Sequence, residues 1–401
     1  MRVLKWVSIG LGGLLALILI GVLVVVWLVD PNRFKPRIEA AVREATGREF
    51  TLVGDIDLGF FPWLALRTGE GRFGNAPGFG PDPMVSWRGA QLGAKLFPLL
   101  RGELVADRVR LTGVDVRLVR HADGHGNWEG IGSQQPTTPE AGGETSLRID
   151  GVEIEDGRIS FVDETVPRRV EVTGFDFTTD EIALGEPFTD SELSGTLYMD
   201  GFAPAGVRFG FKAPRIALDK EFTTLAVEEY ELTFGALELE GGVQGTLGEK
   251  PKFSGRVASN EFDPRALLAA VGIEPPKTTD PKALGRVQAE TKWAFDAGAI
   301  QIDPLALTLD DTHLKGSFRR AAGEDAVGEF SFAGDSLDIT RYVPPPDPAS
   351  EPFTLPTAML KSLRFRGKIE LEQASYADTV MKGVTVRLLL DEQGLRGEAP
   401  K

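Results

Sequence analysis

Few residues of this chain have the side chains that catalysis or metal binding requires. It contains three histidines and no cysteine, which excludes disulfides, thiol catalysis and cysteine-based zinc sites. His121 and His125 lie four residues apart, a spacing that places two metal ligands on one face of a helix. Asp123-Gly124 between them is typical of a turn instead. We therefore interpret this segment as a solvated hairpin loop and predict no metal there.

Two groups of carboxylates are also candidates for a catalytic site. The run from Asp310 to His313 combines carboxylates, a hydroxyl and an imidazole, but no nucleophile motif surrounds it. Asp55 and Asp57 would share one face of a strand, without a base, an acid or a metal ligand to act with. We predict that the protein has no catalytic residues, no metal ligands and no cofactor, and that it is not an enzyme.

A glycine pattern resembling a dinucleotide-binding motif occurs at Gly69, Gly71 and Gly74. Such a motif holds a phosphate only where it opens a helix, whose N-terminal N–H groups face the anion. Pro77 and Gly78 follow shortly after, so no helix begins there. We reject a phosphate site at this position.

The element that must position the rest of the chain is its first hydrophobic run, Trp6 to Val29, which contains no charged residue. As a helix of about 24 residues it would be roughly 36 Å long, enough to span a bilayer. Trp6 and Trp27 lie near its ends, where amphipathic rings favour the membrane interface. A cleaved signal peptide has a shorter apolar core of about 7–15 residues, and a buried core helix is not apolar on all faces. We predict a membrane anchor.

Charge limits the partners but leaves the orientation open. The formal net charge is −15, which disfavours nucleic acid, because nucleic acid needs basic patches to neutralise its phosphates. Arg2 and Lys5 favour a cytoplasmic N-terminus, whereas Arg33 and Lys35 beyond the span argue for the opposite orientation.

A short helix should follow the anchor. Asp30 is suited to cap it, Phe34, Ile38 and Val42 recur at helical spacing, and Gly47 is suited to end it. We expect this apolar stripe to pack against the start of a sheet. The alternative is that the helix lies on the membrane surface through its arginines.

From residue 50 onward the pattern is mostly β, because apolar and polar residues alternate in short runs separated by Gly, Asp and Pro. Helices are few: Asp263-Pro264 should open one that ends at Gly272, and Asp280-Pro281 should open a shorter turn. The pattern predicts a mainly β fold with a long, twisted antiparallel sheet and a few short helices. A closed β-sandwich, in which two sheets cover each other, is the alternative.

Two segments have the composition of linkers, one rich in Gly, Ser, Gln, Thr and Pro and one rich in Pro. They lead to the following predicted organisation: anchor 1–30, N-terminal module of an amphipathic helix and sheet 31–131, linker 132–146, main β domain 147–342, proline-rich linker 343–357 and C-terminal β segment 358–401.

The predicted strands have apolar faces that the few helices cannot cover, and the chain contains 24 Phe. A sheet bent into an open groove could hold lipid chains on such a face, and the anchor makes a lipid ligand the natural expectation. The candidate lining residues come from predicted strands in which apolar and polar residues alternate: Val207, Phe209, Phe211, Tyr230, Leu232, Phe234, Trp293 and Phe295.

Several motifs together resemble the AsmA family. The residues that carry this resemblance most specifically are Phe61, Pro62, Trp63, Asn75, Ala76, Pro77, Gly78, Phe79, Gly126, Asn127 and Trp128. Later segments are similar as well, among them 262–268 and 309–316, so the resemblance covers nearly the whole chain.

The resemblance implies a protein of the Gram-negative inner membrane, single-pass, with a cytoplasmic N-terminus and a periplasmic body. The AsmA family is similar to TamB-like and chorein-type bridge proteins, whose long sheet folds into a taco-shaped hydrophobic groove. It implies phospholipids and the inner membrane as partners, other envelope proteins as further ones, and a role in phospholipid movement and outer-membrane integrity. The competing expectation is a scaffold for assembly of outer-membrane proteins.

Overall fold

The computed structural model describes most of the chain after the predicted anchor. The described residues are 30–59, 64–94, 105–131, 148–166, 168–183, 187–219, 221, 223–323, 326–345, 364–391 and 394–398. Trp6, Trp27, the motif residues 61–63, the linker 132–146 and most of the linker 343–357 lie outside them. No helix within the described part is both long and apolar enough to cross a membrane.

The chain divides into two compact units, Met1–Pro167 and Arg168–Lys401. The described residues of unit 1 form a 3-10 helix, one α-helix and nine strands. These are η1 (Pro31–Phe34), α2 (Lys35–Thr46), β1 (Phe50–Leu52), β2 (Ile56–Gly59), β3 (Leu64–Thr68), β4 (Gly71–Phe73), β5 (Val85–Trp87), β6 (Gly89–Ala94), β7 (Val105–Thr112), β8 (Asp115–Arg120) and β9 (Arg148–Asp163).

The short strands of unit 1 are halves of longer ones. One series of halves pairs in the order β2–β3–β6–β7, and the other in the order β1–β4–β5–β8. Both series end on β9, whose first part pairs with β7 and whose second part pairs with β8. Each long strand is therefore interrupted once, and the interruptions fall on one line across the sheet.

Close contacts fix this line. Gly54 and Gly69 approach so closely that a Cβ on Gly69 would lie 2.9 Å from the Cα of Gly54. Further along, the Gly113 N–H donates to the Glu155 carbonyl over 2.8 Å. The guanidinium of Arg88 forms an ion pair with Asp156, which has a positive φ of 51°. Asp156 lies in β9 between the part that pairs with β7 and the part that pairs with β8.

The helix expected after the anchor is present, but it packs on a different face than expected. The Asp30 side chain accepts from the Asn32 N–H over 3.0 Å and so caps η1, and α2 ends at Gly47 in the left-handed conformation. The predicted packing stripe was wrong at Phe34 and Ile38, which are 46% and 36% exposed, whereas Val42 is half-buried. Polar side chains hold the helix to the sheet in their place, as described below.

The described residues of unit 2 form thirteen strands and two short helices. These are β10 (Arg168–Ala183), β11 (Phe188–Met199), β12 (Val207–Leu218), β13 (Thr224–Phe234), β14 (Leu237–Thr246), β15 (Lys252–Ser259), α4 (Pro264–Ala270), β16 (Val287–Asp296), β17 (Ala299–Leu309), β18 (Thr312–Arg320), β19 (Gly328–Asp338), α5 (Ile339–Tyr342), β20 (Phe365–Tyr376), β21 (Thr379–Asp391) and β22 (Gly394–Glu398).

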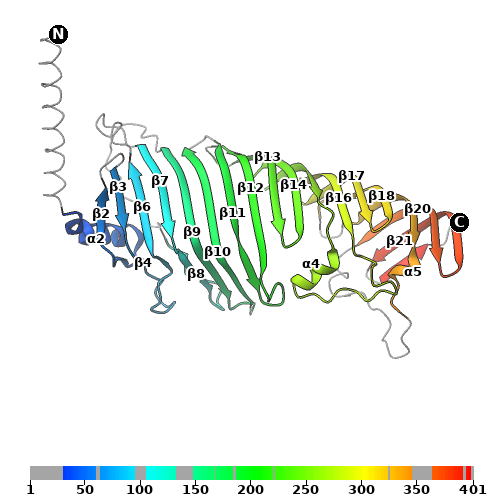
Figure 1. Ribbon diagram of the computed structural model, residues 1–401, viewed down its shortest axis with the longest axis horizontal. Coiled ribbons are helices and arrows are strands. Elements are labelled where there is room, and N and C mark those ends of the chain that lie inside the picture. Colours follow the sequence, from blue (N-terminus) through cyan, green and yellow to red (C-terminus); the bar gives the residue numbers. More distant parts are fainter. Residues whose placement is uncertain are drawn as a thin grey trace, which may run out of the picture. The chain divides into compact units, whose positions relative to one another are not determined.

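From β10 to β19 each strand pairs antiparallel with the next one in the chain, and Figure 1 shows these strands side by side in that order. β20 then pairs parallel with β19, and β21 and β22 continue antiparallel. The prediction of a mainly β fold with a long sheet is confirmed. Unit 2 forms one continuous sheet, whereas the alternative sandwich would need two separate sheets facing each other.

The helix α4 begins where the sequence predicts and ends at Ala270, two residues before the predicted Gly272. The Asp263 carboxylate accepts from the N–H groups of Arg265 and Ala266, and Pro264 takes the first helical position. Below the helix lies a small core of Ala203, Val207 and Val271, which are exposed by 0%, 3% and 4%. The second predicted start, Asp280-Pro281, gives only a turn, in which Asp280 accepts from the Lys282 N–H.

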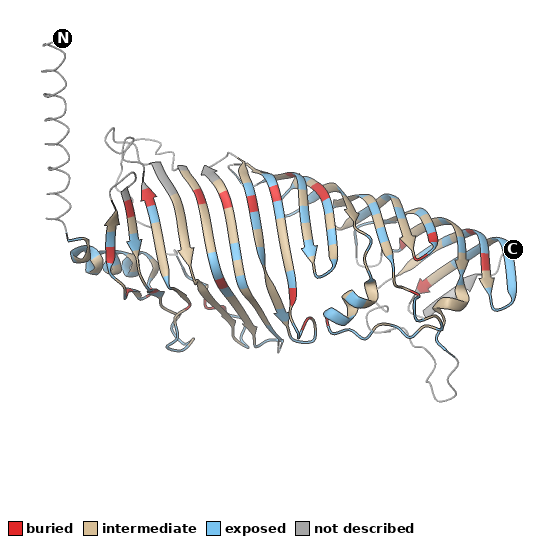
Figure 2. Ribbon diagram, in the orientation of Figure 1, coloured by how far each residue is buried: buried red, intermediate tan, exposed pale blue. Residues whose placement is uncertain are grey.

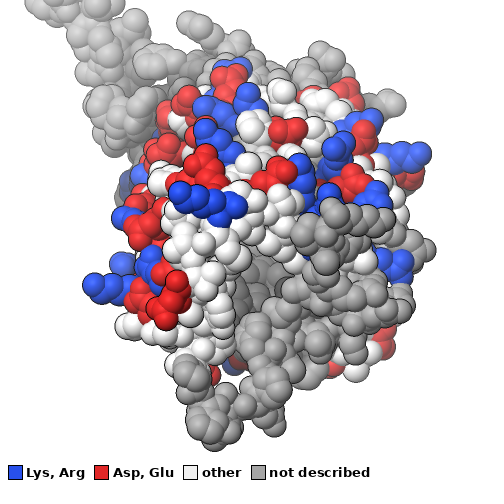
Figure 3. Space-filling view, turned by 90° about the vertical axis from the view of Figure 1, so that its right-hand side faces the viewer, with Lys and Arg blue, Asp and Glu red and all other residues white. Residues whose placement is uncertain are grey.

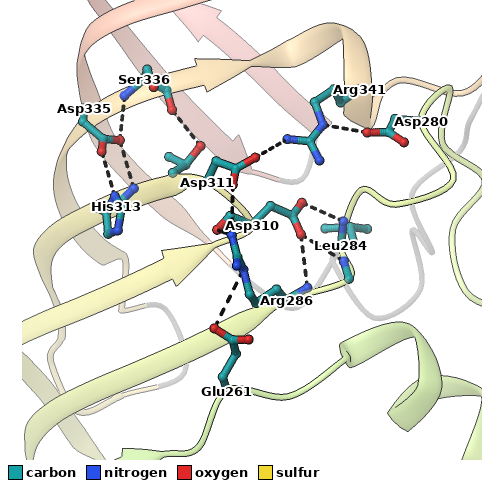
Figure 4. Close-up of polar contacts among 12 residues, drawn as sticks. Glu261, Asp280, Leu284, Arg286, Asp310, Asp311, His313, Asp335, Ser336 and Arg341 are labelled. Carbon is teal, nitrogen blue, oxygen red and sulfur yellow. Dashed lines mark hydrogen bonds and ion pairs between the residues drawn. The ribbon is translucent and has the colours of Figure 1, made fainter.

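A polar cluster at the β17–β18 turn holds the segment between α4 and β16 (Figure 4). The Asp310 side chain is 4% exposed and accepts from the N–H groups of Leu284, Gly285 and Arg286 over 2.9–3.1 Å. The Tyr342 hydroxyl also donates to it, over 2.8 Å. The carboxylate is fully engaged in backbone and hydroxyl hydrogen bonds, so it has a structural role.

The other polar groups of this run are engaged separately. His313 Nδ1 lies 2.8 Å from the Asp335 carboxylate, and the Thr312 hydroxyl donates to the Ser336 carbonyl over 2.7 Å. Desolvation opposes ionisation of Asp335, but hydrogen bonds from His313 and Ser336 outweigh it and hold its pKa at about 2. The carboxylate, hydroxyl and imidazole therefore do not form a relay.

Replacing Asp335 tests this local network through pH. The pKa of Asp335 is about 2 in the folded chain and 3.8 in its ordinary state, so ionisation favours folding above about pH 4. The contribution is lost as the pH falls through about 2. We expect Asp335→Asn to lower the free energy of unfolding by about 0.5–1 kcal/mol at pH 7, since the part-exposed group is screened by solvent.

Urea unfolding of the full chain followed by circular dichroism measures this difference. The gap between the wild type and Asp335→Asn should narrow from pH 5 to pH 2. Asp378→Asn, in the β20–β21 turn, serves as the control because Asp378 has no hydrogen-bond partner among the described residues. A gap that stays constant over this pH range would contradict the assignment.

Candidate functional site

The strand register of unit 2 gathers apolar side chains on one face of the sheet. Phe211 lies opposite Leu193 on one side and opposite Leu232 on the other, and Leu232 in turn lies opposite Leu239. Residues opposite one another in neighbouring strands point to the same face. We call this surface the apolar face.

The apolar face continues toward the C-terminal strands. Trp293 lies opposite Ile302, and Ile302 lies opposite Phe318. Phe318 lies opposite Phe330, which lies opposite Gly367 in the parallel strand β20. The same face is therefore followed residue by residue from β10 to β20.

β-bulges keep this pattern in phase. The register shifts in β13 between Val227 and Tyr230, and again in β17 between Ile302 and Leu305. An extra residue in a bulge reverses the side-chain alternation, so apolar residues on both sides of it can share one face. The sequence changes its apolar phase at the same points, so the bulges match the pattern.

All eight residues predicted to line a groove lie on the apolar face. Phe209 pairs with Phe234, and Phe295 reaches the same face through its pairing with Phe253, which lies opposite Gly245. Val207 differs from the others in burial, because it belongs to the small core below α4 and is 3% exposed. The remaining seven are half-buried.

Half-burial is general on this face, as the strands of Figure 2 show. Few positions of unit 2 are fully buried, and the intervening positions are mostly exposed. A covered core would bury such side chains almost completely. Within the described residues, the apolar face thus lacks a covering layer over much of its length.

The opposite face is charged. Lys212, Glu231 and Glu240 lie opposite one another in β12, β13 and β14, and Arg256 lies opposite Lys292. Lys212 also forms an ion pair with Glu192, with 3.3 Å between nitrogen and oxygen. In the end view of Figure 3, charged side chains of both signs gather on the upper and outer surface, and the described surface below them is mostly uncharged.

Large side chains on the apolar face lie over glycines of the neighbouring strand. Phe209 lies over Gly195 and Trp293 over Gly255, and a Cβ on either glycine would be 3.1–3.2 Å from the ring. Each of these contacts joins residues paired in register. The same arrangement recurs for Tyr230 over Gly241, Phe253 over Gly245, Phe332 over Gly316 and Phe330 over Gly367.

This pairing affects the shape of the surface. A ring that lies over a glycine covers backbone that would otherwise be exposed, and it adds little height to the face. The glycines also reduce the bulk on this face, so the sheet can curve toward it without crowding. Sequence reasoning missed these partners because a glycine within a strand usually indicates only a bulge or a close approach.

A few polar groups lie on the apolar face. Thr179 and Ser191 are 2% and 4% exposed, and their hydroxyls lie 2.9 Å apart. The Tyr230 hydroxyl has no hydrogen-bond partner among the described residues, and burial raises the pKa of Tyr230. This phenol therefore remains neutral at physiological pH and can donate to a polar atom of a bound molecule.

The motif around Asn127 in unit 1 forms a buried polar cluster. Asn127 is fully buried and donates through Nδ2 to Asn75 Oδ1 over 3.0 Å and to the Arg117 carbonyl over 2.8 Å. Its Oδ1 accepts from the Val119 N–H over 3.1 Å. The side chain's hydrogen-bonding capacity is thus used for holding the loop, which is a structural role.

The histidines of the predicted hairpin loop do not converge on a metal. The His121 N–H donates to the His125 carbonyl over 2.9 Å, which confirms the turn. Hydrogen bonds to Glu164 and Glu129 raise the pKa of His121 and His125, respectively. No cluster of three or more metal-ligating side chains occurs in the part of the chain that the structure describes.

A cavity of about 500 Å³ near the β13 bulge is lined by both charged and uncharged residues. Its lining includes Glu192, Lys212, Glu229 and Arg256. Lys212 pairs with Glu192, and Arg256 lies 3.9 Å from Glu229. These charges partner one another and are not arranged as an acid, a base and a nucleophile.

Comparison with known proteins identifies the class of the chain. Residues 1–205 match the AsmA family, which is half of the sequence. No curated protein and no solved structure matches the chain. The protein therefore belongs to the AsmA family, as the motifs indicated. Members of this family are generally not enzymes, and membership supports an envelope-associated role at a membrane.

Replacing a ring-covered glycine tests whether the ring–glycine pairs hold the sheet. A methyl group on Gly255 would overlap the Gly242 carbonyl oxygen and press against the Trp293 ring. We expect Gly255→Ala to lower the free energy of unfolding by about 1–3 kcal/mol. Gly195→Ala should cost less, because its Cβ would meet only side-chain carbons at 3.1–3.2 Å, which can move.

Thermal and urea unfolding of the full chain measures both variants. The order of the two costs is the critical result, since both substitutions add the same methyl group to a strand of the same sheet. Equal costs, or a stabilised Gly255→Ala variant, would show that the close approach at this position is not a constraint.

Proposed function

We propose that this protein binds phospholipids non-enzymatically and conducts them between the inner and outer membranes of a Gram-negative envelope. The observation that carries the proposal is the apolar face of unit 2. It runs from β10 to β20 and is half-buried, and no described residues form a layer over much of its length. The opposite face is charged. In this proposal the acyl chains supply the missing layer.

The energetics favour such a ligand. An acyl chain gains about 0.8 kcal/mol for each CH₂ removed from water, so a long apolar surface is needed to offset what the chain loses by leaving the bilayer. A continuous face over many strands offers this surface, whereas a pocket of a few hundred cubic ångströms does not. The free Tyr230 hydroxyl could also donate to an ester oxygen of the lipid.

In the proposed geometry the sheet of unit 2 folds into a taco-like groove with the apolar face inside. Ring–glycine pairs support this, because they lower the bulk on the inner side. Charged residues such as Lys212 and Glu231 then face the aqueous periplasm, and lipid head groups remain at the open rim. The lining would include Phe209, Phe211 and Leu232.

The membrane topology completes the proposal. The uncharged run Trp6–Val29 anchors the chain once in the inner membrane, with a cytoplasmic N-terminus and a periplasmic body. Family membership supports an envelope-associated role, from which we infer a contribution to outer-membrane integrity. Other envelope proteins are further partners in this account.

One observation favours the competing scaffold role. Within the described residues, β22 pairs with β21 alone, so its other edge could add a strand from a protein client. An assembly factor for outer-membrane proteins would use such an edge. It predicts a stable protein complex and little bound lipid.

Native mass spectrometry with lipid extraction on the purified full chain distinguishes these roles. We expect co-purifying phospholipid in the wild type and its loss in Leu232→Glu, because a charge would then lie on the apolar face. Thr233→Glu is the matched control, since it adds the same charge one residue away on the exposed, opposite face.

Circular dichroism must show that Leu232→Glu is folded. If it is not, Leu232→Ala, which shortens the side chain without adding charge, should reduce the amount of bound lipid while Thr233→Ala should not. Lipid-free wild-type protein that captures a protein client would contradict the lipid proposal and support the scaffold.

A further inference from the structure

Helix α2 is attached to the sheet of unit 1 by its polar side. Glu39 Oε1 accepts from the Leu52 N–H in β1 over 3.0 Å, and Lys35 Nζ lies 3.2 Å from Asp55 Oδ1. Just before the helix, Asn32 accepts from the Ile56 N–H over 2.9 Å and donates to the Ile56 carbonyl over 3.3 Å. These contacts use the side chains that normally face water.

As a consequence, the side of the helix that faces away from the sheet carries an exposed apolar stripe. Phe34 is 46% exposed and Ile38 is 36% exposed, and Ala41 and Ala45 are exposed as well. The spacing of four, three and four residues places all of them on one side of the helix. Amphipathic helices of globular proteins usually bury this side, so the stripe lacks the partner that its composition calls for.

Charged residues flank the stripe, with arginines at its start and the exposed Glu44 further along the same flank. Arg37 is exposed one residue before Ile38, and the Arg33 side chain is 82% exposed, with only a long contact of 3.7 Å to Asp30. Arg43 is exposed on a different side of the helix, about half a turn away from the stripe. An apolar stripe bordered by arginines is complementary to a lipid surface, where anionic phosphates lie above acyl chains.

We infer that α2 lies on the membrane surface, with Phe34 and Ile38 inserted at the boundary between head groups and acyl chains. The inference rests on the proposed anchor, because the uncharged run ends at Val29 and Phe34 follows five residues later. A chain leaving the bilayer at Val29 must still be at the interface when it reaches Phe34. The occupant of the stripe is therefore the bilayer that holds the anchor.

The stripe is too small to recruit a protein to a membrane by itself, and it does not need to. The anchor keeps α2 at a high effective concentration near the surface, so a weak contact suffices to orient it. Because α2 is attached to β1 and β2 by hydrogen bonds, its docking would hold this edge of the unit 1 sheet within about a helix diameter, ~10 Å, of the lipid head groups.

The absence of cysteine from the sequence allows a direct test. Single cysteines at Ile38 and Arg43 of the full chain would carry a spin label, with the protein reconstituted in vesicles of phosphatidylethanolamine and phosphatidylglycerol. Collision with a water-soluble nickel complex and with oxygen then reports the depth of each label. Both positions are exposed, so neither label should disturb the fold, and circular dichroism checks this.

The expected result is several-fold lower nickel accessibility and higher oxygen accessibility at position 38 than at position 43. Equal accessibility in protein that resists carbonate extraction would overturn the inference and leave the anchor intact. Dipolar broadening between labels at position 38 would show a second copy on the stripe, which would also overturn it. Extraction by carbonate would instead refute the proposed anchor, and with it the docking.

Discussion

The packing of large side chains over glycines across neighbouring strands is the interaction on which the structure of unit 2 depends. Phe209 over Gly195 and Trp293 over Gly255 are two examples of a contact that recurs along the sheet. It covers backbone, keeps the apolar side chains low and removes bulk from the face toward which the sheet can curve. Without the glycines the rings would stand against neighbouring side chains, and a long sheet with one uncovered apolar face would be crowded and hard to bend.

Polar groups serve the same architecture at its margins. Asn127 ties the motif loop of unit 1, and Asp310 ties the segment before β16 to the β17–β18 turn through hydrogen bonds to three N–H groups. These side chains are of the types found in active sites, but their hydrogen-bonding groups are occupied mainly by backbone N–H and carbonyl groups. The apolar face has the opposite character, since it is extensive, mostly apolar and, among the described residues, without a protein layer over much of its length. A binding surface for a long apolar ligand explains this division better than a reaction centre does.

The sequence predicts much of the fold, because alternation of apolar and polar residues in runs such as Tyr230–Phe234 survives in the observed strands. The helix caps at Asp30 and Asp263 can also be predicted from the sequence, since they depend on local hydrogen bonds. The face of α2 that packs against the sheet could not be predicted. Glu39 and Lys35 contact the backbone and side chains of residues distant in the sequence, and helical periodicity does not reveal such contacts. Pairing of rings with glycines also depends on cross-strand register, which is set by bulges such as the one before Tyr230. That the eight candidate residues share one face follows from this register, and their contact with lipid stays a prediction.

The most direct test of the central claim is a photo-crosslinking scan of consecutive residues of β13, from Tyr230 to Phe234, in the full chain within bacterial membranes. A photoreactive amino acid replaces one residue at a time, and mass spectrometry identifies the adducts. The account predicts phospholipid adducts with a period of two, at positions 230, 232 and 234 but not at 231 and 233, because only the former lie on the apolar face. Adducts without this alternation, or protein adducts confined to positions 230, 232 and 234, would contradict it.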